Sequence, residues 1–233
     1  MSEILIIVPC YNEQDTIEKV IKNLTKIQSH EKLDILIIDD GSEDNSLEII
    51  KKNKIRFIKN DQNIGIAKSL TIGYEYAIRN NYKYVIQFDS DGQHIADDIP
   101  SLIKNTHEEN DLVIGSRYLN LNYNYNLKGF GSILISKLIN IFFNKKIKDP
   151  TSGLRIIDVK ILRYLINENY SYAMEPLAIC MALKNKFSVK EIPVRMNDRY
   201  FGISSINSFN GAKYMIYFIF KLAKIIFNDK KIN

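Results

Sequence analysis

The chain has 233 residues, of which 45% are hydrophobic and 25% charged, and its formal net charge is +5. This is the profile of an ordinary globular protein, and it excludes a disordered chain, a collagen and a long coiled coil. The two cysteines, Cys10 and Cys180, lie far apart and form no CxxC motif, so we expect neither a disulfide framework nor a zinc site. Such cysteine usage is typical of a reducing cytosol.

Strands and helices are predicted to alternate in the first half of the chain. Short apolar runs at 4–8, 33–38, 55–58, 84–88 and 111–114 predict strands, and the first is continuous, as in a strand buried on both faces. Helices are predicted between them, at 17–27, 46–52, 65–80 and 99–105. This order predicts an α/β fold with a mostly parallel central sheet covered by helices.

The second half of the chain is basic and amphipathic. No acidic residue occurs between Asp111 and Asp149 or between Asp198 and Asp229. Two helices are predicted there, one at about 131–144 with a stripe of serines and asparagines, and one at about 210–228 with a stripe of lysines. Both have broad apolar faces, so we expect them to lie in the headgroup plane of an anionic membrane; the alternative is that both simply pack on the core.

The chain is expected to lie on a membrane rather than across it. Lysines interrupt the apolar stretch near the C-terminus, whereas a span needs ~20 predominantly apolar residues. No basic segment precedes the first apolar run, so no signal peptide is expected. We expect a single domain over 1–205, which contains the helix at about 131–144, and a membrane-surface helix over 206–233. The expected location is cytoplasmic, at the inner face of the cell membrane.

Three predicted strands end in polar clusters, at 9–13 (PCYNE), 39–42 (DDGS) and 89–94 (DSDGQH). In an open α/β sheet, ligands bind outside the carboxyl ends of the strands. Each cluster alone also fits a turn or a helix cap. Three of them in one chain indicate a binding site.

Asp89 and Asp91 are the most informative of these residues. Residues i and i+2 of an extended segment point to the same side, so we expect the two carboxylates to share a divalent cation, Mg²⁺ or Mn²⁺, with Gln93 as a third ligand. Two alternatives stay open: a solvated acidic turn, and a haloacid-dehalogenase-type phosphatase with Asp89 as the nucleophile. Arg117, after a later strand, offers a guanidinium fork for phosphate or is a surface charge.

Six short motifs occur in the order found in family 2 glycosyltransferases, at 9–13, 39–42, 63–65, 89–94, 115–118 and 149–155. Over residues 4–205 the sequence resembles the dolichol-phosphate mannosyltransferase-like branch, which also includes bacterial polyprenyl-phosphate sugar transferases. The resemblance implies a single Rossmann-like GT-A domain that binds a nucleotide sugar and a divalent cation. Arg199, Gly202 and Ser204 match the family's flap segment, and Ser205 stands where a Lys is common.

The resemblance also implies roles for individual residues. Contacts to the nucleotide sugar are expected from Pro9, Tyr11, Glu13, Asp39, Asp40, Lys68, Asp89, Ser90 and Arg199. The expected metal ligands are Asp89, Asp91 and Gln93, and the expected acceptor contacts are Arg117, Lys128, Ser152 and Arg155. The expected catalytic residues are Asp91, Arg117 and Asp149.

The expected function is metal-dependent, inverting transfer of a hexose from a nucleotide-diphosphate sugar to a polyprenyl phosphate. A lipid phosphate with a second pKa of about 6 arrives as an anion, whereas a sugar hydroxyl needs a general base, for which Asp149 and Glu175 are the candidates. Transfer to a hydroxyl of a surface polysaccharide or lipid-linked glycan is the alternative, followed by the phosphatase and a non-catalytic membrane-surface nucleotide-binding module. Expected partners are the donor, the acceptor, an anionic membrane surface and a membrane protein, but not nucleic acid.

Overall fold

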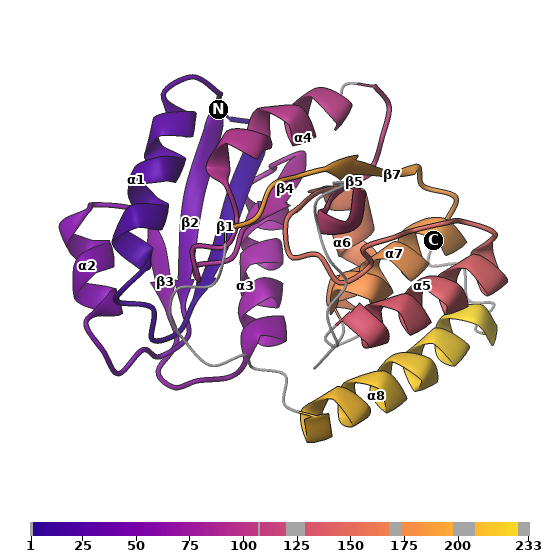
Figure 1. Cartoon of the computed structure of the whole chain (residues 1–233). Coiled ribbons are helices and arrows are strands. Elements are labelled where there is room, and N and C mark those ends of the chain that lie inside the picture. The colour runs from indigo at the N-terminus through magenta and orange to yellow at the C-terminus, as the bar shows by residue number, and fades with distance from the viewer. Residues whose placement is uncertain (1, 107, 120–128, 168–173, 198–207, 228–233) are drawn as a thin grey trace.

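The computed structural model describes residues 2–106, 108–119, 129–167, 174–197 and 208–227, and it centres on a seven-stranded sheet (Figure 1). The strands are β1 (Ile4–Cys10), β2 (Leu33–Asp39), β3 (Phe57–Lys59), β4 (Tyr84–Gln87), β5 (Leu112–Ser116), β6 (Arg155–Asp158) and β7 (Val189–Pro193). Their order in the sheet is β3-β2-β1-β4-β6-β5-β7. Only β6 runs antiparallel to its neighbours among the described strands, so the prediction of a mostly parallel sheet is confirmed.

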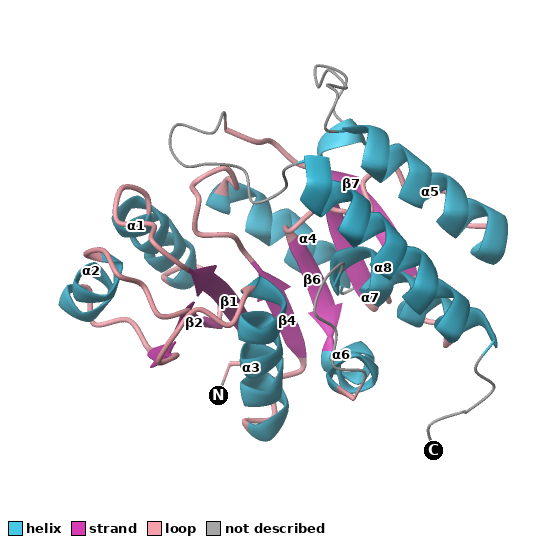
Figure 2. Cartoon of the chain, turned by 90° about the horizontal axis from the view of Figure 1, so that it is seen from below, coloured by secondary structure: helices cyan, strands magenta, loops and turns pink. Residues whose placement is uncertain are grey.

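Helices cover both faces of this sheet (Figures 1 and 2). One layer holds α1 (Ile17–Gln28), α2 (Ser46–Lys52) and α4 (Ile99–Thr106), and the other holds α3 (Ile66–Arg79), α5 (Gly129–Phe143), α6 (Val159–Ile166), α7 (Met174–Lys184) and α8 (Ser208–Phe227). Successive residues of β1 alternate between the two layers, because Ile4, Ile6 and Val8 pack in the first core and Leu5 and Ile7 in the second. Burial on both faces explains the continuous apolar run of this strand.

β1 is longer than predicted and contains a proline at its carboxyl end. Pro9 is tolerated there because β4 has already ended: its last pair with β1 is Ile7 with Gln87, whereas β2 pairs with β1 as far as Cys10. Proline lacks an amide hydrogen, so it is confined to positions that donate no ladder hydrogen bond. The carbonyl oxygen of Pro9 points away from β2 and accepts a hydrogen bond from the Ser90 hydroxyl at 2.7 Å.

β6 enters the sheet from late in the chain and lies between β4 and β5. Its antiparallel register pairs Arg155 with Gln87, the last residue of β4. This pairing brings the segment at 149–155 beside the acidic cluster that follows β4. Two motifs that are far apart in sequence therefore meet at one edge of the sheet.

α5 and α8 lie side by side on the outside of the second layer, and α8 also packs on α7 (Figure 2). Phe218 and Leu222 of α8 are buried in the core that α3, α6 and α7 share. Lys184, at the end of α7, donates to the carbonyl oxygens of Ile225 and Ile226 at 2.5 and 3.1 Å. Its ammonium group therefore caps the C-terminal end of α8. α8 is therefore packed firmly onto the rest of the protein.

Each of these two helices also exposes an apolar side. The large apolar residues exposed there are Ile133, Leu134, Ile141 and Phe142 of α5 and Ile216, Ile219, Phe220 and Phe227 of α8, which we call the α5–α8 face. The serines of the predicted stripe on α5 point inward, since Ser132 is buried and Ser136 donates to the carbonyl oxygen of Ile147. None of the described helices has an apolar stretch long enough to cross a membrane.

Candidate active site

The loops after β1 and β2 are held together at the carboxyl edge of the sheet. Asn12 adopts a positive φ of 54°, and its Oδ1 accepts the amide of Glu43 at 2.8 Å. Gly41 has a φ of +73°, and a Cβ at this position would lie 2.6 Å from the backbone of Gln62. The Asn12–Glu43 hydrogen bond thus joins the loops after β1 and β2, and only glycine at position 41 allows the loop after β2 to approach the segment after β3 so closely.

Two consecutive carboxylates at the end of β2 have opposite surroundings. Asp40 accepts hydrogen bonds from Asn60 Nδ2 at 2.8 Å and from the amides of Ile64 and Gly65 at 3.1 and 2.9 Å, and so holds the start of α3. Asp39 is fully buried, and neither of its carboxylate oxygens has a hydrogen-bond partner. Because a buried carboxylate without donors costs free energy, Asp39 is suited to receive donors from a ligand.

The other predicted donor-side residues differ in their exposure. Tyr11 is 39% exposed and Lys68 is exposed on the first turn of α3. Glu13 is half-buried, and Ser90 is buried with its hydroxyl on the carbonyl oxygen of Pro9. Tyr11 and Lys68 thus offer their side chains to solvent, whereas Pro9 and Ser90 bond to each other within the fold.

Asp89 and Asp91 lie at a turn, which corrects the expectation of an extended segment. β4 ends at Gln87, and the chain turns at residues 90–91. Asp91 Oδ1 accepts the amide of Gln93 at 3.0 Å, as in a turn closed by an aspartate side chain. The physical reason is that Gly92, with a φ of +75°, reverses the chain directly after the acids.

One carboxylate oxygen of Asp89 has a partner and the other does not. Oδ2 lies 3.0 Å from His94 Nε2, while Oδ1 is covered and has no hydrogen-bond partner. Burial by itself would raise the pKa of Asp89, but His94, Arg117 and Arg155 together hold this pKa below its ordinary value. Asp89 is therefore an ionised carboxylate with one oxygen suited to a cation or a donor.

The acidic turn offers oxygen atoms that suit a metal ion. The described residues contain no group of three or more His, Cys, Asp or Glu side chains in metal-binding positions. The partnerless Oδ1 of Asp89 nevertheless suits a hard cation, since such ions take carboxylate and amide oxygens. Asp91 and the half-buried Gln93 in the same turn supply oxygens of both kinds.

The loop before β6 packs directly against Asp89. A Cβ on Gly153 would lie 3.0 Å from Asp89 Oδ1 and closer still to Oδ2, so this position requires glycine. The buried Ser152 hydroxyl donates to the backbone of β5 at 2.6 Å. Arg155 is fully buried and donates to the carbonyl oxygens of Ser152 and Glu175 at 3.0 and 2.7 Å. Ser152 and Arg155 thus use these polar groups to build the loop, and their expected contacts to the acceptor stay a prediction.

Arg117 and Asp149 form one ion pair. Arg117 Nε and Nη2 donate to Oδ2 and Oδ1 of Asp149, both at 2.7 Å, and the amide of Arg117 donates to Oδ2 at 2.9 Å. The Asp149 side chain has no exposed surface, whereas that of Arg117 is 22% exposed. Of these two expected catalytic residues, only Arg117 reaches the surface. Lys128 and Arg199 lie outside the described residues.

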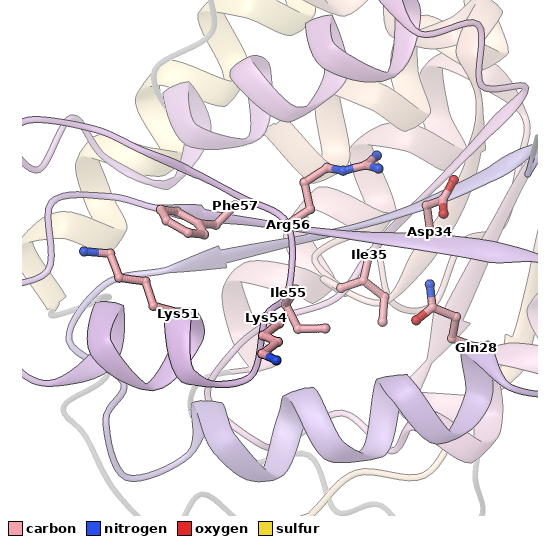
Figure 3. Close-up of a pocket in the computed structure, with 8 residues that line it drawn as sticks. All are labelled: Gln28, Asp34, Ile35, Lys51, Lys54, Ile55, Arg56 and Phe57. Atoms are coloured by element: carbon pink, nitrogen blue, oxygen red, sulfur yellow. The ribbon is translucent and has the colours of Figure 1, made fainter.

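A hollow of about 470 Å³ lies at the other edge of the sheet (Figure 3). It is lined by Gln28, Asp34, Ile35, Lys51, Lys54, Ile55, Arg56 and Phe57. Asp34 is near the start of β2, whereas Asp39 ends this strand, so the hollow is separate from the acidic edge. None of the residues predicted for the site lines it.

Comparison with known proteins decides the family. The model described as "Glycosyl transferase family 2" matches residues 5–166. The chain belongs to this family. The family 2 assignment makes the protein a glycosyltransferase, as predicted, and sets aside the phosphatase and the non-catalytic module.

Relatives of this family 2 member carry more specific names. The UDP-N-acetylglucosamine–dolichyl-phosphate N-acetylglucosaminyltransferase of Methanococcus voltae is 30% identical over 215 residues, which cover 82% of this chain and 84% of that protein. The polyprenol monophosphomannose synthase of Mycolicibacterium smegmatis is 24% identical over 219 residues, which cover 88% and 82%. These names support the predicted polyprenyl-phosphate branch of the family.

A solved structure confirms the GT-A fold. Glucosyl-3-phosphoglycerate synthase from Mycobacterium tuberculosis, in complex with Mn²⁺, UDP-glucose and phosphoglyceric acid, matches with a TM-score of 0.71 at 15% sequence identity. The match covers 94% of this chain and 79% of that one. At this identity the likeness concerns the fold.

Sequence reasoning missed one residue that supports the site. Glu191 of β7 accepts the amides of Lys148 and Asp149 at 2.7 and 2.8 Å, directly behind the Arg117–Asp149 pair. The sequence feature that could have indicated this residue is an acid within the short strand VKEIP at 189–193. A charge in such a strand is ordinarily interpreted as facing solvent. His94, which the sequence showed only as the last residue of the polar cluster at 89–94, is the direct partner of Asp89.

Proposed function

We propose that this glycosyltransferase moves a hexose from a nucleoside-diphosphate sugar to a polyprenyl phosphate, with inversion and with a divalent cation, at a membrane surface. The observation that carries the proposal is the pair Asp39 and Asp89, which stand at the carboxyl edge of the sheet with buried oxygens that lack donors. The relative from M. voltae is named for dolichyl phosphate and that from M. smegmatis for polyprenol monophosphomannose, which supports the acceptor class.

The donor occupies the edge formed by the loops after β1 and β2. Asp39 receives hydrogen-bond donors of the base or ribose, because its two oxygens are the unsatisfied acceptors there. The exposed Tyr11 ring and the exposed Lys68 ammonium stand at the same edge, as partners for the nucleoside and the diphosphate. Asp40 supports this edge indirectly by holding the start of α3. Arg199, in the segment that matches the family's flap, is proposed to contact the diphosphate.

Asp89, Asp91 and Gln93 would hold the divalent cation. When bound, such a cation neutralises the negative charge that develops on the leaving nucleoside diphosphate. The chain's own contribution is to keep Asp89 ionised, through His94, Arg117 and Arg155, and to leave one of its oxygens without a protein donor.

Arg117 is proposed to meet the acceptor phosphate, which needs no general base because a phosphate monoester with a second pKa of about 6 is already anionic. The two carboxylates considered as bases are both engaged within the fold. Both oxygens of Asp149 accept from Arg117, and Glu175 Oε1 accepts from Gln87 Nε2 at 3.3 Å. This supports a phosphate acceptor over a sugar hydroxyl, whose attack requires a positioned base.

The α5–α8 face supports a place on the membrane. Its exposed apolar residues on two adjacent helices lie beside Lys213 and Lys224, which are exposed on α8. An amphipathic helix of this kind lies in the interface plane, and each Lys adds ~1 kcal/mol near an anionic leaflet. We propose that α8, within the segment 206–233, and α5 together rest on the cytoplasmic leaflet.

The deciding experiment measures transfer from UDP- and GDP-hexoses to polyprenyl phosphate and to soluble glycans, with Mg²⁺, with Mn²⁺ and in excess chelator. Transfer to polyprenyl phosphate that stops in chelator is the expected result. Transfer to glycan hydroxyls with refusal of polyprenyl phosphate would show that the hydroxyl-acceptor alternative is correct. Full activity in chelator would contradict the role of the acidic turn.

A further inference from the structure

We infer that Asp149 and Glu191 are positioning residues that fix the orientation of Arg117 for the acceptor. The sequence suggests Asp149 as a catalytic residue and a candidate general base, and it predicts no role for Glu191. The structure instead shows a chain of hydrogen bonds, which we call the relay, from Glu191 on β7 through the backbone amides of residues 148–149 and the Asp149 carboxylate to the guanidinium of Arg117. This inference rests on the proposed function, in which Arg117 meets the acceptor phosphate.

The first part of the relay is the fork between Arg117 and Asp149. Two guanidinium nitrogens and the amide of Arg117 all donate to the same carboxylate, at 2.7, 2.7 and 2.9 Å. A bidentate pair of this kind fixes the plane of the guanidinium as well as its position. Thr151 Oγ1 accepts from Nη2 at 3.2 Å and adds a further restraint.

Burial decides which member of the pair can meet a ligand. Asp149 has no exposed surface and both of its oxygens are occupied, so it cannot reach a substrate hydroxyl as a general base must. Arg117 keeps 22% of its side chain exposed while its anchor is buried. Asp149 therefore acts on the reaction through Arg117.

The second part of the relay holds Asp149 itself. Both oxygens of Glu191 are used on this segment, Oε2 by the amide of Lys148 and Oε1 by the amide of Asp149. In the sheet Glu191 pairs with Ile114 of β5, the strand that leads into Arg117. The same β5–β7 ladder thus positions both ends of the relay: Glu191 on β7 holds the amide of Asp149, and Arg117, directly after β5, holds its carboxylate.

The test compares Asp149→Asn, Glu191→Gln, Thr151→Val, Arg117→Ala and the double variant Arg117→Ala/Asp149→Asn. We expect Asp149→Asn to raise the KM for polyprenyl phosphate about tenfold and to leave the donor KM within about twofold, because the fork is misplaced but the donor edge is not touched. Glu191→Gln and Thr151→Val should raise the acceptor KM by smaller factors. In the Arg117→Ala background, Asp149→Asn should have no further effect, since the two residues act as a unit.

Asp158→Asn is the matched control. Asp158 is a buried aspartate at the other end of β6, where it caps α6 by accepting the Lys160 amide at 2.7 Å. Its loss should lower the melting temperature without changing the acceptor KM. Thr151→Val, which removes one hydroxyl, serves if Asp149→Asn does not fold.

A readout independent of activity separates this inference from the proposed function. Modification of Arg117 by phenylglyoxal, followed by mass spectrometry, should be faster in Asp149→Asn than in the wild type and unchanged in Asp158→Asn. Equal rates in wild type and Asp149→Asn, or additive effects in the double variant, would overturn the relay. If the wild type refuses polyprenyl phosphate, the proposed function fails, and the modification rates alone decide the relay.

Discussion

At the scale of single residues, Asp39 and Asp40 show how the fold uses neighbouring carboxylates in opposite ways. Asp40 accepts three hydrogen bonds and joins the end of β2 to the start of α3. Asp39 is just as well buried but has no donor for either oxygen. A residue that destabilises the fold in this way is typical of a binding site, where ligand contacts offset the cost.

The two asparagine variants should therefore differ. Asp40→Asn removes charge-assisted hydrogen bonds to a buried group, so we expect a loss of about 1–3 kcal/mol in the free energy of unfolding. Asp39→Asn should leave the melting temperature equal or higher, because the buried charge is gone, but should weaken nucleoside-diphosphate binding. Thermal unfolding and calorimetric titration with UDP and GDP check both; a large loss of stability in Asp39→Asn would contradict its role as a ligand acceptor.

Gly153 and Gly131 give a second matched pair. A Cβ at Gly153 collides with the Asp89 carboxylate, so Gly153→Ala should cost about 1–3 kcal/mol of stability and disturb metal-dependent transfer. A Cβ at Gly131 meets only Met215 Cε, at 3.9 Å, so Gly131→Ala in α5 should stabilise by about 0.5–1 kcal/mol. Denaturant unfolding and assays at a series of Mn²⁺ concentrations measure both effects. Equal changes in stability and in Mn²⁺-dependent activity in the two variants would contradict the importance of the close approach of Gly153 to Asp89.

At the scale of elements, α5 and α8 each have two apolar sides with different uses. One side is part of the core, where Ile135, Ile139, Phe218 and Leu222 are buried. The other side is the exposed α5–α8 face. Deletion of α8 would therefore open the core as well as remove the surface, so point substitutions on the exposed side are the better test of membrane binding.

Phe220→Asp and Ile141→Asp should each weaken flotation with anionic vesicles and leave the melting temperature within about 2 °C, because Phe220 is 69% and Ile141 71% exposed. Ile66→Asp is the control with the same charge change, at a residue that is 56% exposed on α3 rather than on α5 or α8. The proposed membrane surface would be contradicted if Phe220→Asp and Ile141→Asp weakened flotation no more than Ile66→Asp, or if flotation did not depend on anionic lipid.

At the scale of the whole molecule, stability and ligand binding are carried by different parts. Two apolar cores lie on the two faces of the sheet, and the candidate site lies at its carboxyl edge. The fold should therefore not depend on the cation, whereas donor binding should.

Excess chelator should abolish transfer and leave the melting temperature unchanged. Addition of Mn²⁺ with the correct nucleoside diphosphate, at about a hundred times the Kd, should raise the melting temperature by about 5–10 °C, because a ligand that binds only the folded state adds about 2.7 kcal/mol. Differential scanning calorimetry with UDP and GDP measures this shift. A melting temperature that falls in chelator alone would show that the cation is structural.

The sequence by itself determined the alternation of strands and helices, the buried character of β1 and the family. These features are local or follow from ordered motifs: apolar periodicity reports burial within one element, and short polar runs mark the strand ends. Asp39 and the acidic pair were found in this way. The family match confirms the class of enzyme and the solved structure confirms the fold, while the roles of the single residues stay predictions.

Only the tertiary structure decided which of the polar residues point outward. The insertion of β6 between β4 and β5 places Gly153 against Asp89 and buries Arg155, and the β5–β7 pairing places Glu191 behind Asp149. Such contacts join residues that are distant in the chain, and no periodicity within one element encodes its register with another. For this reason the sequence indicated Arg117, Asp149 and Arg155 as candidates but missed Glu191. It also could not separate Arg117, which reaches the surface, from Asp149 and Arg155, which are buried.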